Sequence, residues 1–123
     1  MATMPRVSVL IPTHNRARHV ALAIQSALAQ EYQDMEVLVI DDGSTDETPA
    51  VLASFGTAIR VHASSHHSAG HARNLGLAHS HGELVAFLDS DDLWRADKLR
   101  KQVAALDAMP GVGLVGCRYQ RID

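Results

Sequence analysis

The sequence predicts an α/β fold in which a mainly parallel sheet is flanked by helices on both faces. Short apolar runs rich in β-branched residues alternate with helical patterns along the chain, which is the order of successive βαβ units. The runs are nearly continuously apolar, as in strands that are buried on both faces of a parallel sheet. The 123 residues are enough for one such domain, and no repeat or linker divides them.

Five apolar runs are expected to be strands. The first run, residues 6–12, is expected to end at Pro12, because proline cannot donate a hydrogen bond to a neighbouring strand. The other runs cover residues 35–40, 58–62, 83–88 and 112–117. In the last run, Cys117 is expected to be a small buried strand residue.

Helical patterns separate these runs. Apolar residues recur every four positions in a stretch without Gly or Pro, which predicts an amphipathic helix over residues 17–29. A second helix is expected to follow the cap residues at 44–49 and to close at Gly56. A third helix is predicted to end at Gly82, with Ala72, Leu75 and Ala78 facing inward. A fourth helix is predicted to carry Leu99, Val103 and Leu106 on one face.

Polar and acidic segments follow three of the predicted strands, at residues 12–15, 41–44 and 89–92. Ligands of parallel α/β sheets bind at the carboxyl ends of the strands. The three segments are therefore expected to line one edge of a Rossmann-like sheet. Taken alone, segment 41–44 reads equally well as a turn whose aspartates cap the next helix.

The most informative segment is the acidic one, which carries Asp89, Asp91 and Asp92. Two like charges about 4 Å apart repel by about 1 kcal/mol in water and by more near a protein surface. A divalent cation would turn this repulsion into ligation, because Mg²⁺ and Mn²⁺ prefer carboxylate oxygens. The alternative is an acidic turn that suits the dipole of the following helix. We favour the metal site.

Composition narrows the class of partner. The net charge of −3 gives no basic face for nucleic acid, so nucleic acid is not expected as a partner. No apolar run approaches the roughly 20 residues of a membrane-spanning helix. The single cysteine favours a reducing compartment. The predicted location is the cytoplasm, with a peripheral position at the inner face of the membrane as the alternative for a longer protein.

Four blocks, at residues 7–16, 39–46, 70–76 and 82–92, resemble in order and spacing the successive motifs of family two inverting glycosyltransferases with the GT-A fold. The resemblance covers nearly the whole chain. It implies that residues 1–123 are the nucleotide-sugar-binding portion of a transferase. The donor would be a nucleoside-diphosphate sugar, most simply a UDP-sugar, with Mg²⁺ or Mn²⁺ as cofactor and a glycan, lipid or protein hydroxyl as acceptor.

The resemblance also implies roles for individual residues. Asp91 would be the direct metal ligand, and Asp89 would face the ribose or the metal. The implied substrate-binding residues are Pro12, Thr13, Asn15, Asp41, Asp42, Arg73, Asp89 and Ser90. The general base that inversion requires would lie beyond Asp123. The chain is therefore expected to have no catalytic residue of its own and to bind donor without completing transfer.

Other interpretations stay open. One is a non-catalytic nucleotide-binding module. Another is a nucleotidyltransferase, which would need a basic, Gly-rich loop where this chain has residues 13–16. A zinc site is a weaker interpretation, because the candidate histidines straddle a loop and a helix and have no cysteine partner. These histidines are His66, His67, His71, His79 and His81.

Overall fold

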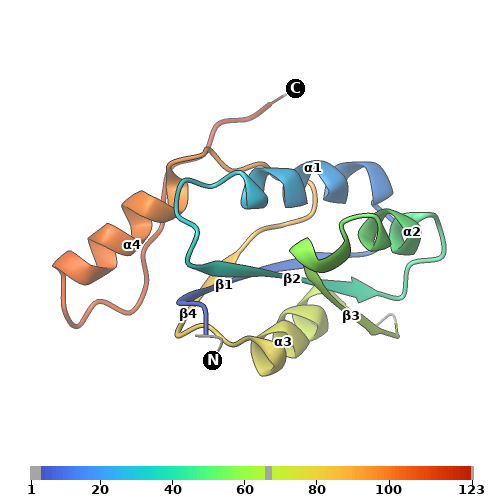
Figure 1. Cartoon of the computed structure of the whole chain (residues 1–123), viewed down its shortest axis with the longest axis horizontal. Helices are drawn as coiled ribbons and strands as arrows, with labels where there is room; N and C mark the ends of the chain where they lie inside the picture. Colours follow the sequence, from blue (N-terminus) through green and yellow to red (C-terminus); the bar gives the residue numbers. More distant parts are fainter. Residues whose placement is uncertain (1–3, 66–67, 123) are drawn as a thin grey trace.

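Strands and helices alternate along the chain in the predicted order (Figure 1). The computed structural model describes residues 4–65 and 68–122. The strands are β1 (Val7–Thr13), β2 (Met35–Asp42), β3 (Arg60–Ser64) and β4 (Leu84–Phe87). The helices are α1 (Ala17–Leu28), α2 (Thr48–Ala53), the 3₁₀ helix η1 (Gly56–Ala58), α3 (Ala69–His79) and α4 (Lys98–Ala108).

The four strands form one all-parallel sheet in the order β3-β2-β1-β4. β1 therefore lies in the interior of the sheet, between β2 and β4. At its carboxyl end, Thr13 pairs with Asp41 of β2, and Asp42 pairs with Ser64 of β3. This register brings the segments that follow β1, β2 and β4 to the same edge, as the sequence predicts.

Helices cover both faces of the sheet, which confirms the predicted fold class. In Figure 1, α1 and α2 lie on one side of the strands and α3 lies on the other. Successive strand side chains point to opposite faces. Val9 and Ile11 of β1 thus belong to the larger core with α1 and α2, and Leu10 belongs to the smaller core with Ala72 of α3. Both parities of β1 are buried, which explains its continuous apolar sequence.

The first two strands end later than predicted. β1 continues through Pro12 to Thr13, and β2 includes Asp42. Leu10 O accepts a hydrogen bond from Leu88 N at 3.0 Å, so the backbone polar groups of Leu10, and of Pro12 two residues later, face β4. β4 has ended at the level of Pro12, so the missing N–H leaves no strand hydrogen bond unmade.

The third helix differs from the prediction at its carboxyl end. It buries Ala72 and Gly76, whereas Ala78, predicted to face inward, is exposed. Residues four apart share a helix face, and Ala78 lies two positions beyond Gly76. The helix ends before Gly82, which instead packs against the start of β1. A Cβ at Gly82 would lie 2.6 Å from the backbone nitrogen of Ser8.

Two predicted elements are shortened or missing. The second helix, α2, ends at Ala53, and Gly56 begins the 3₁₀ helix instead of closing α2. The predicted strand at 112–117 is wrong, because described residues 112–122 form neither helix nor strand. Cys117 is exposed, so its prediction as a buried strand residue is also wrong. An apolar run becomes a strand only beside a partner edge, which the run itself cannot supply.

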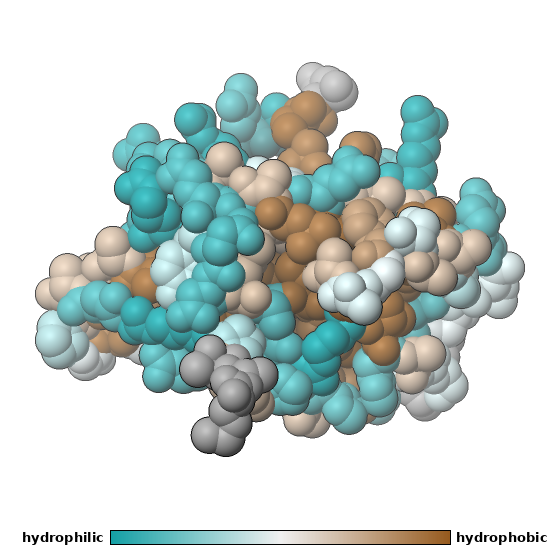
Figure 2. All heavy atoms as spheres, in the orientation of Figure 1, coloured by the Kyte–Doolittle hydropathy of each residue, from teal (hydrophilic) through white to brown (hydrophobic). Residues whose placement is uncertain are grey.

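Some large apolar side chains remain at the surface. Figure 2 shows hydrophobic residues that reach the surface in the middle of the face in view, with hydrophilic residues around them. Leu22, Phe87 and Leu93 are each about half exposed. None of the helices in the described ranges is both long enough and apolar enough to cross a membrane.

Candidate functional site

A cleft of about 380 Å³ lies at the carboxyl edge of the sheet, within the roughly 300–1,000 Å³ of small-molecule sites. Its walls come from the ends of β1 and β2, the first turns of α3 and the acidic loop after β4. The lining residues are Pro12, Thr13, His14, Arg16, Asp42, Ala69, Ala72, Arg73, Asp89, Ser90 and Asp91. The structure thus brings together seven predicted residues: Pro12, Thr13, Asp42, Arg73, Asp89, Ser90 and Asp91.

At the β1–β2 end of the cleft, two polar side chains are buried. Thr13 is 4% exposed and Asp42 is 3% exposed. Asp42 Oδ1 accepts a hydrogen bond from Ser64 Oγ at 2.9 Å. Among the described residues, none makes a hydrogen bond to the hydroxyl Oγ1 of Thr13. A buried hydroxyl without a partner costs about 1–3 kcal/mol, so a ligand group that bonds to Thr13 would stabilise this end of the cleft.

Asp41, also predicted to bind substrate, does not line the cleft. It is 6% exposed, and its Oδ1 accepts a hydrogen bond from the backbone N–H of Ser44 at 3.2 Å. Gly43 between them has φ +77°, a left-handed conformation that glycine adopts without strain. Asp41 therefore holds the turn that follows β2, which is the structural alternative left open for segment 41–44. Its contact with a donor stays a prediction.

Asn15 also lies outside the lining of the cleft. Its side chain contacts the loop after β2, where its Oδ1 accepts hydrogen bonds from the backbone N–H groups of Thr45 at 2.7 Å and Asp46 at 3.2 Å. The predicted contact of Asn15 with the donor likewise stays a prediction.

At the other end of the cleft, the carboxylates of Asp89, Asp91 and Asp92 converge. One oxygen from each lies within 4.8 Å of the others, and all three residues are exposed. Partial desolvation, and then the charges of Asp91 and Asp89, raise the pKa of Asp92. Like charges therefore oppose ionisation in this cluster, and a divalent cation with a preference for hard oxygen ligands would relieve the repulsion. The residues present fit Mg²⁺ or Mn²⁺.

Two arginines partly balance this negative charge. Arg73 Nη2 lies 2.9 Å from Asp89 Oδ1, and Arg16 Nη1 lies 3.8 Å from Asp91 Oδ2. All four side chains are more than a third exposed, so these ion pairs add little stability. Because the arginines lie beside the acids at the mouth of the cleft, they are well placed to contact an anionic group there.

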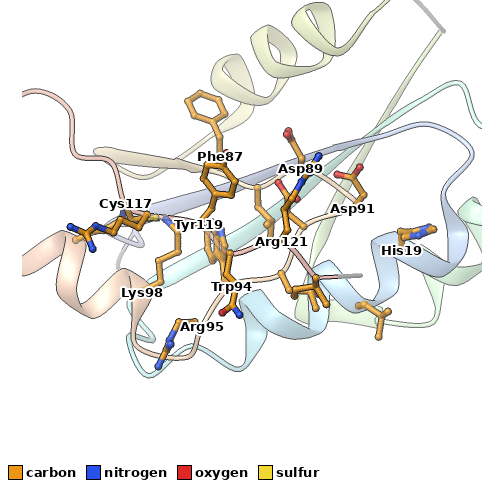
Figure 3. Close-up of a pocket in the computed structure, with 18 of the residues that line it drawn as sticks. His19, Phe87, Asp89, Asp91, Trp94, Arg95, Lys98, Cys117, Tyr119 and Arg121 are labelled. Atoms are coloured by element: carbon orange, nitrogen blue, oxygen red, sulfur yellow. Dashed lines mark hydrogen bonds between the residues drawn. The ribbon is translucent and has the colours of Figure 1, made fainter.

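The acidic loop also borders a larger cleft of about 1450 Å³ (Figure 3). Its walls come from α1, α4 and residues 117–122. Figure 3 shows Asp89 and Asp91 above Trp94, with Tyr119 and Arg121 of the C-terminal stretch nearby. Trp94 packs against the main core, and Lys98 Nζ lies 4.9 Å from the centre of its ring.

Sequence reasoning missed three residues of the smaller cleft: Arg16, Ala69 and Ala72. For Arg16 a signal was available, because it closely follows the first predicted strand on the edge that carries the acids. Nothing local marks the two alanines, which line the cleft because α3 packs across the sheet.

The zinc interpretation has limited support. His66 and His67 lie outside the described residues. In the part of the chain that the structure covers, the acidic cluster is the one group of three potential ligands close enough to share an ion.

The fold and the site define an α/β domain with a ligand cleft at the carboxyl edge of a parallel sheet and an acidic cluster suited to a divalent cation. The chain matches the family described as glycosyl transferase family 2 over residues 8–123, and it belongs to that family. This confirms the resemblance seen in the sequence. An uncharacterized glycosyltransferase of Rickettsia typhi is 36% identical over 120 residues, which cover 97% of this chain and 38% of that protein.

Solved structures agree. The mannosyltransferase PcManGT from Pyrobaculum calidifontis, in complex with GDP-Man and Mn²⁺, is 31% identical with a TM-score of 0.80. The match covers 96% of this chain and 36% of that one. TarS 1–349 of S. aureus in complex with UDP-GlcNAc is 26% identical with a TM-score of 0.74, over 90% of this chain and 37% of that chain. The protein described here thus spans little more than a third of the chains with which it is compared.

Proposed function

We propose that this chain is the donor-binding part of a glycosyltransferase that uses a nucleoside-diphosphate sugar. The observation that carries the proposal is that the smaller cleft has two chemically different ends. One end has the buried side chains of Thr13 and Asp42, which suit the polar edge of a base, and the other has the acidic cluster. The complexes of the similar TarS and PcManGT with UDP-GlcNAc and GDP-Man support this class of ligand. A UDP-sugar is the donor that we favour.

Asp91 and Asp89 would hold Mg²⁺ or Mn²⁺, as their converging oxygens allow. When bound, the cation would act as a Lewis acid for the leaving diphosphate. The protein's own part is to supply positive charge beside it, because Arg73 and Arg16 already lie next to these acids. If Arg73 left its ion pair with Asp89 and bound a donor phosphate instead, its positive charge would lie on the leaving group and would stabilise the transition state.

Transfer would proceed with inversion to a hydroxyl of a glycan, lipid or protein acceptor. That step needs a general base in reach of the acceptor. We place the base, with the acceptor site, in protein outside residues 1–123, which bind donor without completing transfer. The greater length of the similar proteins supports this division. The lone exposed Cys117 supports a reducing compartment, and we propose the cytoplasm, with the inner membrane face as a peripheral site.

Isothermal titration with UDP and GDP, with and without Mn²⁺, tests the proposal. The Asp91→Asn variant removes a ligand charge, and Asp107→Asn is a matched control, because Asp107 pairs with Arg6 away from the cleft. We expect nucleotide binding to depend on Mn²⁺. Asp91→Asn should weaken this binding at least about tenfold, because even residues that only support a metal ligand typically change metal affinity by about 10–100-fold when mutated. Asp107→Asn should bind like the wild type. Metal-independent binding unaffected by Asp91→Asn would favour a nucleotide-binding module, and absence of binding would contradict the proposal.

A further inference from the structure

Asn15 has an unusual backbone conformation. It follows His14 in the loop between β1 and α1, and its φ is +48°. In the described part of the chain it is the one residue other than glycine with a positive φ. Asparagine tolerates this left-handed conformation better than most residues. The conformation turns the chain so that the backbone N–H and the side chain of Asn15 both face the loop after β2.

Asn15 joins the two loops by several hydrogen bonds. Its Oδ1 accepts from the backbone N–H groups of Thr45 and Asp46, at 2.7 and 3.2 Å. Its own backbone N–H donates to Ser44 Oγ at 2.9 Å, and its Nδ2 lies 3.4 Å from Thr45 Oγ1. One side-chain oxygen thus satisfies two backbone donors in a segment that has left the sheet, as an N-cap residue does at a helix start.

These bonds continue the β1–β2 connection beyond the sheet. The last backbone pair of the two strands is Thr13 with Asp41. Past that pair, His14 Nδ1 lies 2.8 Å from Asp42 O, and the Asn15 bonds follow. The two polar residues that line the buried end of the cleft, Thr13 and Asp42, lie directly before the joined loops. The two loops that Asn15 joins thus begin at these two residues.

We propose that Asn15 is a positioning residue for the base end of the cleft. It fixes the β1–α1 loop to the β2–α2 loop, so that the Thr13 hydroxyl and the Asp42 carboxylate face one nucleoside, and it contacts no part of the donor. The proposal rests on the proposed function, and it replaces the expected donor contact of Asn15. A preformed cleft binds more tightly because less ordering is required when the ligand arrives.

Three variants separate the possible effects. Asn15→Gly accepts the positive φ but has no side chain to hold the second loop. Asn15→Asp keeps an oxygen that can accept both backbone N–H groups and also tolerates the conformation. Gln30→Ala is the control for general destabilisation. Gln30 is 2% exposed, follows the carboxyl end of α1, and bonds to Arg95 O and Leu99 N, whereas Asn15 precedes the amino end of α1.

The measurements are the affinities for UDP, for GDP and for Mn²⁺ alone, by isothermal titration. We expect Asn15→Gly to weaken nucleotide binding about tenfold and to leave Mn²⁺ binding unchanged, and Asn15→Asp to stay within about threefold of the wild type. Gln30→Ala should lower the melting temperature without changing either affinity. The proposal is overturned if Asn15→Gly binds nucleotide like the wild type, or if Gln30→Ala loses the same nucleotide affinity.

A second readout keeps the test independent of the proposed function. Hydrogen exchange of the Thr45 and Asp46 amides reports directly on their hydrogen bonds to Asn15. We expect faster exchange in Asn15→Gly and kept protection in Asn15→Asp. Unchanged exchange in Asn15→Gly would show that Asn15 does not hold this loop. If the wild type binds neither UDP nor GDP, the proposed donor fails, and the exchange data alone decide whether Asn15 holds the loops.

Discussion

Replacement of Gly82 by alanine should be strongly destabilising. Gly82 precedes β4 and lies against the first residues of β1. An alanine Cβ there would lie 2.6 Å from Ser8 N, 2.8 Å from Arg6 O and 2.8 Å from Val7 C. Non-bonded heavy atoms favour separations of about 3.5 Å or more. All three neighbours are backbone atoms in or beside a strand that pairs on both sides, so they cannot turn away as a side chain would.

The size of the effect follows from this rigidity. Extra methylenes in a packed core cost about 1–3 kcal/mol, and a clash with fixed backbone belongs at the upper end. For a domain of this size, 1 kcal/mol corresponds to about 4 °C in melting temperature, so Gly82→Ala should melt about 12 °C below the wild type. Thermal unfolding followed by far-UV circular dichroism measures this shift.

Two glycines of α3 provide matched controls. At Gly70 the nearest atom to an added Cβ is Ser68 Oγ at 3.8 Å. Gly70→Ala should therefore increase the free energy of unfolding by up to about 1 kcal/mol through helix propensity, and so raise the melting temperature. At Gly76 the nearest atom is Leu10 Cδ1 at 3.1 Å, a side-chain end that can shift, so Gly76→Ala should fall between the other two. A melting temperature for Gly82→Ala at or above that of Gly76→Ala would refute the reasoning.

Two further predictions concern polar side chains that are buried or partly buried. Burial raises the pKa of Glu36, but hydrogen bonds from Ser8, the His81 N–H and Arg60 outweigh it and lower the pKa below its ordinary value of 4.5. Stabilisation by Glu36 is therefore present above that value and is lost as the pH falls through the lower folded pKa. Glu36→Gln should lower the free energy of unfolding, measured in urea, by about 1–2 kcal/mol at neutral pH and by progressively less in acid. An equal cost at both pH values would contradict this. Gln30→Ala should cost about 2–3 kcal/mol, because it leaves buried backbone groups unpaired, whereas the exposed Gln25→Ala should cost less than about 0.5 kcal/mol; equal melting temperatures of the two variants would exclude the role of Gln30.

The layered fold could be predicted because its signal is local. In β1, Val9, Leu10 and Ile11 are all apolar, and this continuity already indicates burial on both faces. The segments after the strands are polar at positions where buried strands end, and parallel pairing places them on one edge. From these two facts, a shared site for Thr13, Asp42 and the acidic loop can be predicted from the sequence.

The partners of individual side chains could not be predicted, because they depend on contacts between distant loops. Asn15 and Asp41 sit in segments with the right composition for a ligand site, yet both side chains bond to the turn after β2. The run at 112–117 has the composition of a strand, but the described residues there pair with no edge. Composition reports what a residue can do, and the neighbours that decide between its options are set by tertiary structure.

The sheet order has a consequence for how the site assembles during folding. Val7 of β1 pairs with Met35 of β2, which lies one helix later, but also with Leu84 of β4, which comes after three strands of chain. Contacts between distant parts of a chain form late, because closing the longer loop costs more entropy. The β1–β2 end of the cleft, with Thr13 and Asp42, should therefore form before β4 docks and delivers the aspartates. Pulse-labelled hydrogen exchange during refolding should show β2 amides protected earlier than those of β4.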